Sequence, residues 1–176
     1  ERPFVVKPNS EGSSVGVRIV LKNDNDDRLL EDDFKYGDDV LVETYIAGRE
    51  LSIAVMGGKP LAVTEIHTPE GFYDYSNKYT EGGSYHEIPA PIDDGVYKEA
   101  MGMALKAHEV LGCRGVSRAD FRYDDTQGEP GLLYMLEINT QPGMTPMSLV
   151  PEQAAHVGYP FGKLVAWMVE EARCEA

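Results

Sequence analysis

Cysteine is scarce in this sequence: only Cys113 and Cys174 occur among 176 residues. Two cysteines so far apart are typical of a protein from a reducing compartment such as the cytosol, and they argue against a small disulfide-stabilised fold. Histidines with the spacing of zinc ligands are also lacking. We therefore expect structural or solvated roles for all four histidines, which are His67, His86, His108 and His156.

Basic residues and long apolar runs are few as well. The 16 Lys and Arg against 30 Asp and Glu give a formal net charge of −14, which argues against a nucleic acid or an anionic membrane surface as partner. No apolar run approaches the ~20 residues that are needed to span a bilayer. We therefore expect no nucleic-acid partner and no membrane partner.

What the sequence does contain is a stretch that joins an apolar run to oxygen ligands. The pattern of Leu132–Asn139 predicts a buried strand, which ends where Gln-Pro-Gly follows. Because side chains alternate along a strand, Glu137 and Asn139 should share a face with Leu133 and Met135. A buried carboxylate needs a partner, and Mg²⁺ prefers carboxylate and amide oxygens. An edge strand with solvated polar residues is the alternative.

The preceding segment, Gly115–Tyr123, alternates in the same way. Arg118 and Asp120 share one of its faces. The turn-rich residues between the two segments predict a hairpin with a long loop. Antiparallel pairing can bring Asp120 beside Glu137 and Asn139, and with Arg118 nearby this would form a site for cations and phosphate.

These motifs resemble the signature of D-alanine–D-alanine ligases, within the ATP-grasp superfamily. The resemblance is carried by Arg-x-Asp at 118–120 and Glu-x-Asn-Thr-x-Pro-Gly at 137–143, and it extends from Lys7 to about Phe161. It implies an α+β ATP-grasp fold with a mixed or antiparallel sheet and flanking helices. Residues 1–43 would be the later part of the central, ATP-binding domain, and residues 44–176 the C-terminal ligase domain.

The sequence does not begin with Met, and no signal peptide precedes the first expected strand. Ligases of the resembled family have an N-terminal domain and the first part of the central domain ahead of this point. We therefore expect this chain to be the later part of a longer enzyme.

The resemblance implies a two-step reaction in peptidoglycan precursor synthesis in the bacterial cytoplasm. ATP would phosphorylate one D-alanine to an acyl phosphate, and the amine of a second D-alanine would displace the phosphate. Asp120, Glu137 and Asn139 would hold two Mg²⁺ ions, for which Mn²⁺ could substitute. Arg118 would stabilise the transferring phosphate and the oxyanion, together with the N–H of Gly143. The full-length enzyme would be a homodimer.

The resemblance also assigns residues to the phosphates of ATP. Lys7 would bind a phosphate, and Ser13 and Ser14 would lie at the tip of a loop that closes over ATP and substrate. This loop, residues 9–16, is neither a Walker loop nor a Gly-x-Gly-x-x-Gly turn, and taken alone it would be an ordinary hairpin loop.

The adenosine part of ATP would lie on another segment. Glu43, Tyr45 and Ile46 match the residues that hold adenine, and Glu50 matches the carboxylate that accepts hydrogen bonds from the ribose. Spacing alone would favour solvated strand ends for Glu43 and Glu50.

Two further segments match the substrate end of the family's site. The long irregular segment from Thr68 to Tyr85 resembles the loop that closes over the active site; there Lys78 would contact phosphates and Tyr79 would hydrogen-bond with Ser13. Family variants that make D-alanyl-D-lactate typically carry Phe in place of this tyrosine, so Tyr79 favours an amine acceptor. Ser148 and Leu149 match the residues that hold the carboxylate of the second D-alanine, although Ser148 could be an ordinary cap serine.

The clearest helical pattern covers Asp93–Gly112, with an aspartate at its start and a glycine at its end as caps. A second helix should open at Pro151, and an amphipathic helix should cover residues 161–172. The side chains expected in the core are Val96, Ala100, Met103, Ala104, Ala107 and Leu111 from the first helix, and Phe161, Leu164, Val165 and Met168 from the last. Further strands are expected at Phe4–Val6, Val15–Leu21, Val40–Ile46, Glu50–Met56 and Pro60–Ile66, and a short helix at Leu29–Phe34.

Two other interpretations stay open. The first is another ATP-grasp ligase with a different acid or acceptor, such as D-lactate, against which Tyr79 and Ser148-Leu149 argue. The second is a non-catalytic fragment that binds Mg-ATP, because the family's missing domains supply part of the first D-alanine site and a further Lys for ATP.

Overall fold

The computed structural model describes residues 3–12, 14–22, 39–68 and 84–173. No helix within these residues is long and apolar enough to cross a membrane. The chain divides into two compact units. The first contains the described residues up to Ile46, with Thr68, Ser84 and Tyr85; the second contains Ala47–His67 and the described residues from His86 onward. The domain boundary expected after residue 43 stays a prediction.

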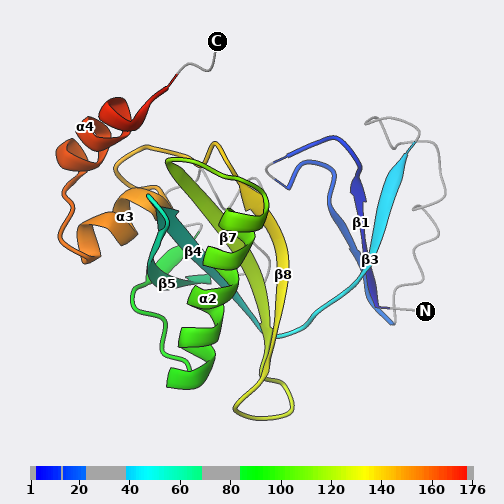
Figure 1. The fold of residues 1–176 in the computed structure, drawn as a ribbon. Helices are drawn as coiled ribbons and strands as arrows, with labels where there is room; N and C mark the ends of the chain where they lie inside the picture. Colours follow the sequence, from blue (N-terminus) through cyan, green and yellow to red (C-terminus); the bar gives the residue numbers. More distant parts are fainter. Residues whose placement is uncertain (1–2, 13, 23–38, 69–83, 174–176) are drawn as a thin grey trace. The chain divides into compact units, whose positions relative to one another are not determined.

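The first unit contains a three-stranded antiparallel sheet in the order β2-β1-β3. The strands are β1 (Phe4–Pro8), β2 (Arg18–Val20) and β3 (Val40–Thr44), and β1 and β3 are labelled in Figure 1. The predicted strands are confirmed, although β2 and β3 are shorter than the apolar patterns suggested. The helix expected at Leu29–Phe34 lies outside the described residues.

The second unit is built on a five-stranded sheet in the order β6-β5-β4-β7-β8. Its strands are β4 (Arg49–Met56), β5 (Lys59–His67), β6 (Tyr85–Glu87), β7 (Val116–Asp124) and β8 (Leu132–Asn139). Its helices are α2 (Asp94–Val110), α3 (Leu149–His156) and α4 (Phe161–Glu171). The predicted hairpin of β7 and β8 is confirmed as an antiparallel pair.

Alternation along β4 divides the second unit into two apolar clusters, one on each face of the sheet. Leu51, Ile53 and Val55 pack in the cluster that includes α2, which runs along the sheet in Figure 1. Ala54 and Met56 pack in the cluster that includes residues of α3 and α4. The sheet is therefore the middle layer, with α2 on one face and α3 and α4 on the other.

Helix α2 confirms the predicted helix, because Asp93 caps its start and accepts hydrogen bonds from the N–H groups of Gly95 and Val96. The expected burial of Leu111 is wrong, since this residue is 62% exposed. The helix ends at Val110, so Leu111 lies beyond the last turn. The buried stripe instead continues to His108.

The buried His108 should make the protein less stable in acid. Its Nδ1 lies 2.7 Å from Ser117 Oγ, and burial lowers the pKa of its imidazole below the ordinary value of 6.5. As the pH falls, His108 therefore binds a proton in the unfolded chain at a higher pH than in the folded protein. The free energy of unfolding should consequently fall as the pH drops below about 6.5. Urea unfolding at pH 7.5 and pH 5.5 should show a smaller drop for His108→Gln than for the wild type. The exposed His156→Gln is the control, and an equal drop in all three proteins would contradict this expectation.

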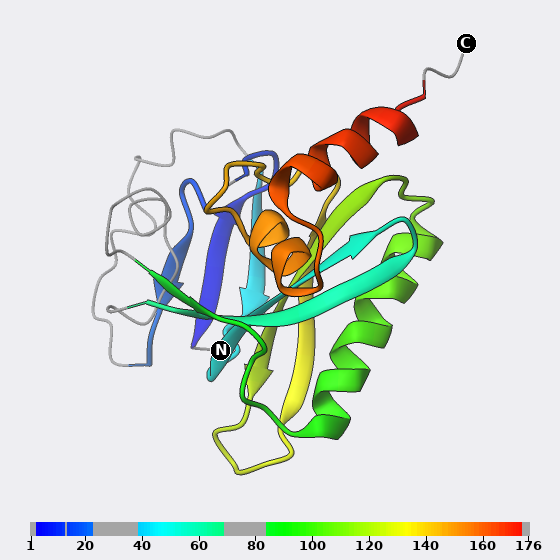
Figure 2. The same ribbon diagram turned by 90° about the vertical axis from the view of Figure 1, so that its left-hand side faces the viewer.

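Helix α4 is less buried than its amphipathic pattern predicts. Leu164 is its only buried residue, whereas Phe161 and Val165 are each 38% exposed. The expectation that Phe161 and Val165 belong to the core is therefore wrong. The helix extends away from the sheet in Figure 2 and touches the cluster with a narrow stripe of Leu164, Trp167 and Met168.

Candidate active site

The face of the five-stranded sheet that meets α3 also carries a group of polar side chains. Asp120 on β7 lies directly opposite Ser52 on β4. The hydroxyl of the fully buried Ser52 donates to Asp120 Oδ1 over 2.7 Å. Nothing in the sequence pointed to Ser52, because a serine in an apolar strand fits no ligand pattern until its cross-strand partner is known.

A β-bulge lies where β7 meets β8. Asp120 pairs with Glu137, but the next residue of β7, Phe121, pairs with Met135. Leu136 is therefore an extra residue on β8, and it has no partner of its own in the ladder. Such a bulge shifts the alternation of side chains on the bulged strand by one residue.

The bulge decides which face receives the predicted metal ligands. Glu137 and Asn139 point to the same face as their partners on β7, which is the Asp120 face. Leu133 and Met135 pack on the opposite face, in the α2 cluster. The prediction that all four share one face is therefore wrong. The strand is also not buried: β8 lies at the edge of the sheet, as the alternative interpretation had it.

Asn139 joins the two carboxylates. Its Nδ2 lies 3.2 Å from Asp120 Oδ2 and 3.2 Å from Glu137 Oε1. The partly positive NH₂ group thus lies where a cation would neutralise both acids, and turning the amide over would present Oδ1 there instead. Two carboxylates and an amide oxygen on one face are a ligand set that suits Mg²⁺.

Arg118 belongs to the same group. Its Nη2 lies 2.6 Å from Asp120 Oδ2 and its Nε lies 2.9 Å from Asp120 Oδ1, so the guanidinium forms a bidentate contact with the carboxylate. The structure therefore brings together all four residues that the sequence analysis placed at the cation and phosphate site. The positive charge of Arg118 lies directly beside the predicted ligands, where a phosphate oxygen could share it.

Glu50 lies on the same face, further along β4. It pairs with Arg122 in the ladder, and Arg122 Nη1 lies 3.6 Å from Glu50 Oε2. Arg122 also donates to the carbonyl of Gly48 over 2.6 Å. The carboxylate assigned to the ribose is therefore held by a neighbouring arginine, in the row of residues that includes Ser52 and Asp120.

The predicted substrate residues lie at the start of α3. Ser148 is the N-cap residue, but its hydroxyl makes no cap hydrogen bond; it accepts from the N–H of Thr145 at 3.1 Å and lies 2.8 Å from Thr145 Oγ1. A Cβ on Gly143 would lie 3.1 Å from Ser148 Oγ, so Gly143 lies beside this hydroxyl. The side chain of Leu149 is buried, which leaves its backbone N–H, in the first turn of α3, as the group able to meet a carboxylate.

The first unit holds the other described residues assigned to ATP. Lys7 Nζ on β1 lies 2.7 Å from Glu43 Oε2 on β3, so the structure brings these two together. Ser14 has a positive φ of 61° and begins a turn in which its carbonyl accepts from the N–H of Val17. Tyr45 and Ile46 follow the end of β3 and are half-buried. Ser13, Lys78 and Tyr79 lie outside the described residues.

A family model described as the D-Ala D-Ala ligase C-terminus matches residues 1–170. The chain belongs to this family. Proteins named D-alanine–D-alanine ligase are similar to it along almost its whole length. The protein of Paramagnetospirillum magneticum is 61% identical over 175 residues, and that of Granulibacter bethesdensis is 53% identical over 175 residues. Each alignment covers 99% of this chain and 57% of the relative, so the chain spans little more than half the length of these relatives.

Solved structures confirm the predicted α+β ATP-grasp fold. A D-alanine–D-alanine ligase from Bacillus anthracis complexed with ATP matches with a TM-score of 0.75 and 28% identity, covering 96% of this chain and 52% of that chain. The VanG D-Ala:D-Ser ligase from Enterococcus faecalis matches with a TM-score of 0.76 and 32% identity, covering 96% of this chain and 49% of that chain.

A second charged group in this ligase-family chain lies on the α2 face of the sheet, around Arg49. Arg49 pairs with the buried Glu65 through two nitrogens, with Nε 2.8 Å from Oε1, and this hydrogen bond is the main reason that the pKa of Arg49 is raised. Its guanidinium lies 5.9 Å from the ring centroid of Tyr123. Burial, and then a hydrogen bond to Glu129, raise the pKa of the Tyr123 hydroxyl.

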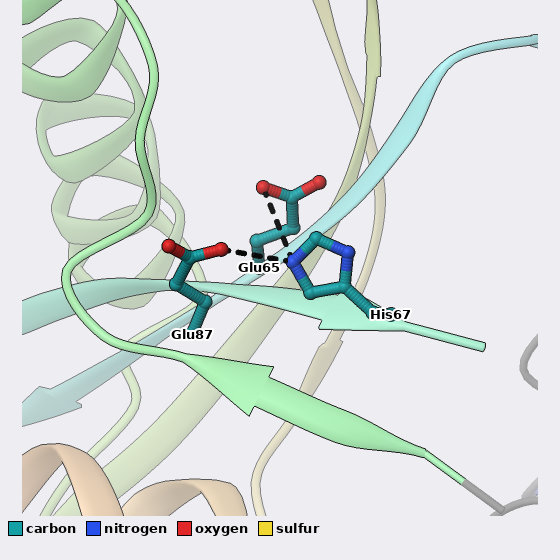
Figure 3. A group of neighbouring side chains, drawn as sticks. All are labelled: Glu65, His67 and Glu87. Carbon is teal, nitrogen blue, oxygen red and sulfur yellow. Dashed lines mark hydrogen bonds and ion pairs between the residues drawn. The ribbon is translucent and has the colours of Figure 1, made fainter.

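His67 lies beside this group, as Figure 3 shows. Its Nε2 is 3.1 Å from Glu87 Oε2 and 3.6 Å from Glu65 Oε2, and one ligand atom from each of the three residues lies within 4.8 Å of the others. The spacing of histidines alone did not reveal this group, because Glu87 comes from another strand. Since Arg49 already balances the charge of Glu65 and His67 is in hydrogen-bond contact with Glu87, these contacts account for the arrangement without a bound metal ion.

Proposed function

We propose that the full-length protein carrying this sequence joins two D-alanines to D-alanyl-D-alanine, with ATP as the source of energy, for peptidoglycan precursor synthesis. The observation that carries the proposal is the gathering of Asp120, Glu137, Asn139 and Arg118 on one face by the β8 bulge. Membership of the ligase family and the names of the relatives support the choice of reaction.

In this proposal the polar group on the sheet holds the reacting phosphates. Asp120, Glu137 and Asn139 would hold two Mg²⁺ ions, for which Mn²⁺ could substitute, and the ions would supply positive charge to the phosphate oxygens. Arg118 donates hydrogen bonds to the transferred phosphate, and its contact with Asp120 becomes correspondingly weaker. When the second D-alanine attacks the acyl phosphate of the first, Arg118 and the N–H of Gly143 stabilise the negative charge that develops on its carbonyl oxygen.

The remaining residues bind ATP and close the site. Lys7 and Lys78 bind phosphate oxygens, and Ser14 belongs to the covering loop. Adenine lies against Glu43, Tyr45 and Ile46, and Glu50 accepts hydrogen bonds from the ribose. The pairing of Lys7 with Glu43 supports their assignment to a single site. Residues 1–43 belong to the ATP-binding domain and residues 44–176 to the C-terminal domain of a cytoplasmic homodimer.

The acceptor is held at the start of α3. Ser148 and the backbone of Leu149 bind the carboxylate of the second D-alanine, and Tyr79 with Ser13 orients its amine. A second candidate is a ligase with another acceptor, because one matching structure is a D-Ala:D-Ser ligase. The relatives named D-alanine–D-alanine ligase are more similar, with up to 61% identity against 32%, and they favour D-alanine.

Phosphate release from Mg-ATP by the full-length protein tests both candidates. D-Alanine, L-alanine, D-serine and D-lactate are added singly, and D-serine and D-lactate also with D-alanine. We expect phosphate release with D-alanine alone, matched by an equal amount of dipeptide. ATP binding without release that depends on D-alanine would disprove the ligase reaction, and a mixed product in preference to the dipeptide would favour the second candidate.

Gly143→Ala should weaken binding of the acceptor. The new methyl group would lie 3.1 Å from Ser148 Oγ, which is closer than most real Cβ contacts, so the hydroxyl has to move. Because small displacements of binding groups are costly, we expect the KM for the second D-alanine to rise about tenfold. Gly162→Ala is the matched control, since its Cβ would point into open space. Equal KM values in both variants would place Ser148 outside the acceptor site.

A further inference from the structure

A buried glutamine ties α3 to the sheet. Gln153 is fully buried, and both ends of its amide contact the backbone of β4: Oε1 accepts from the N–H of Ala54 at 2.8 Å, and Nε2 donates to the carbonyl of Ser52 at 3.0 Å. The ladder of β4 with β5 is irregular at this place, where the pairing shifts between Ile53 and Val55. Ala54 has no partner on β5 in this register, so Gln153 supplies the acceptor that a regular ladder would provide for the Ala54 N–H, and it adds a donor to the Ser52 carbonyl.

On the strand, the residue that Gln153 contacts also touches the proposed cation site. Ser52 accepts from Gln153 with its carbonyl and donates with its hydroxyl to Asp120 Oδ1. Ser52 and Gln153 are both fully buried, so water does not compete for these bonds. Ser52 therefore contacts both Gln153 and Asp120, so a single residue of β4 links α3 to the proposed cation site.

On the helix side, Gln153 belongs to the helix that begins at the proposed acceptor site. Gln153 lies in the eight-residue helix α3, whose N-cap is Ser148. Glu152 provides a second tie, since its Oε2 lies 2.6 Å from His86 Nδ1 on β6. This contact is partly exposed, whereas the two amide contacts of Gln153 are directional and buried, so we expect the amide contacts to contribute more to fixing how far along β4 the helix lies.

From these contacts we infer that Gln153 is a positioning residue, which sets the place of the acceptor-binding end of α3 relative to the strand that holds Asp120. The inference rests on the proposed function for the roles of Ser148 and Asp120. Apolar packing alone would hold α3 on the sheet but would let it slide, because apolar contacts have no direction. Two hydrogen bonds to fixed backbone groups allow a single register.

Gln153→Met tests the inference in the full-length protein, because it keeps the volume and removes both hydrogen bonds. We expect the KM for the second D-alanine to rise about tenfold and kcat/KM for D-alanine to fall up to about 10²-fold, with less than about a twofold change in the KM for ATP. Val63→Ala is the matched control that loses stability without changing a side chain of the α3 cluster, because Val63 packs in the α2 cluster. A purely structural role of Gln153 would lower the yield of active protein in both variants and leave both KM values unchanged, which would overturn the inference.

A double-mutant cycle adds a sharper measurement. If Gln153 acts through Ser148, Gln153→Met should raise the KM for the second D-alanine much less when Ser148→Ala is already present. Additive effects would overturn the inference. Should Gln153→Met not fold, Gln153→Asn keeps the amide but shortens the side chain by one methylene group, which weakens both contacts without introducing a charge. The same rise in the KM for the second D-alanine is expected, and an unchanged KM would overturn the inference.

Hydrogen exchange measures the contact without reference to activity. The amide of Ala54 and the amides of α3 should exchange at least about tenfold faster in Gln153→Met than in Val63→Ala. Unchanged protection would overturn the inference even if the protein ligates D-alanine. A wild-type protein that fails to ligate would disprove the proposed function, and loss of protection confined to Ala54 and α3 would still uphold the role of Gln153 as the anchor of α3.

Discussion

Replacement of Glu137 by glutamine in the full-length protein is expected to lower the rate of D-alanine ligation by about a thousandfold. Glu137 pairs with Asp120 across the sheet and is joined to it by the amide of Asn139. Glutamine keeps the size of the side chain but removes the charge that would hold a cation, and bound cations stabilise phosphoryl transfer by several kcal/mol.

The fold should survive this change, because Glu137 is exposed at the edge strand. The measurement is steady-state phosphate release over a range of Mg²⁺ concentrations, together with thermal unfolding. Glu99→Gln, on the exposed side of α2, is the matched control and should behave like the wild type. Normal turnover at ordinary Mg²⁺ in Glu137→Gln would remove Glu137 from the set of metal ligands.

Replacement of Arg49 by methionine should cost about 3 kcal/mol or more in the free energy of unfolding. The side chain of Glu65 is only 6% exposed, and its charge is balanced by the paired nitrogens of Arg49. Removing Arg49 leaves the buried Glu65 with the His67 imidazole, 3.6 Å away, as its nearest described partner, and breaking a buried pair in this way costs more than the pair itself contributes. The loss of contacts to Asp125, Glu129 and the Pro91 carbonyl adds to the effect.

The double variant Arg49→Met with Glu65→Met should recover most of this loss, since no unpaired charge is left. Urea unfolding at neutral pH measures both effects. Lys98→Met on the exposed side of α2 is the control, and it should change the free energy of unfolding by less than about 0.5 kcal/mol. A loss as small as that in Arg49→Met would contradict the expectation that Arg49 balances a buried charge.

The strands and helices of this chain were largely predictable, because they depend on local patterns. The alternation in Gly115–Tyr123 and the caps of α2 are examples, since each is encoded by neighbouring residues. Expected burial was less accurate for Leu111, Phe161 and Val165. An apolar stripe shows which side of a helix can be buried, but the neighbouring elements decide how much of it is covered.

The candidate site, too, was predictable from the sequence only in part. The sequence by itself determined the chemistry: two carboxylates, an amide and an arginine in two adjoining strands, and the family to which those motifs belong. Only the tertiary structure decided the geometry. The bulge at Leu136 turns Glu137 and Asn139 to the Asp120 face, and Gln153 and Ser52 link that face to α3. Such features arise from pairing between segments far apart in the chain, and a pattern read along one strand contains no information about its partner's register.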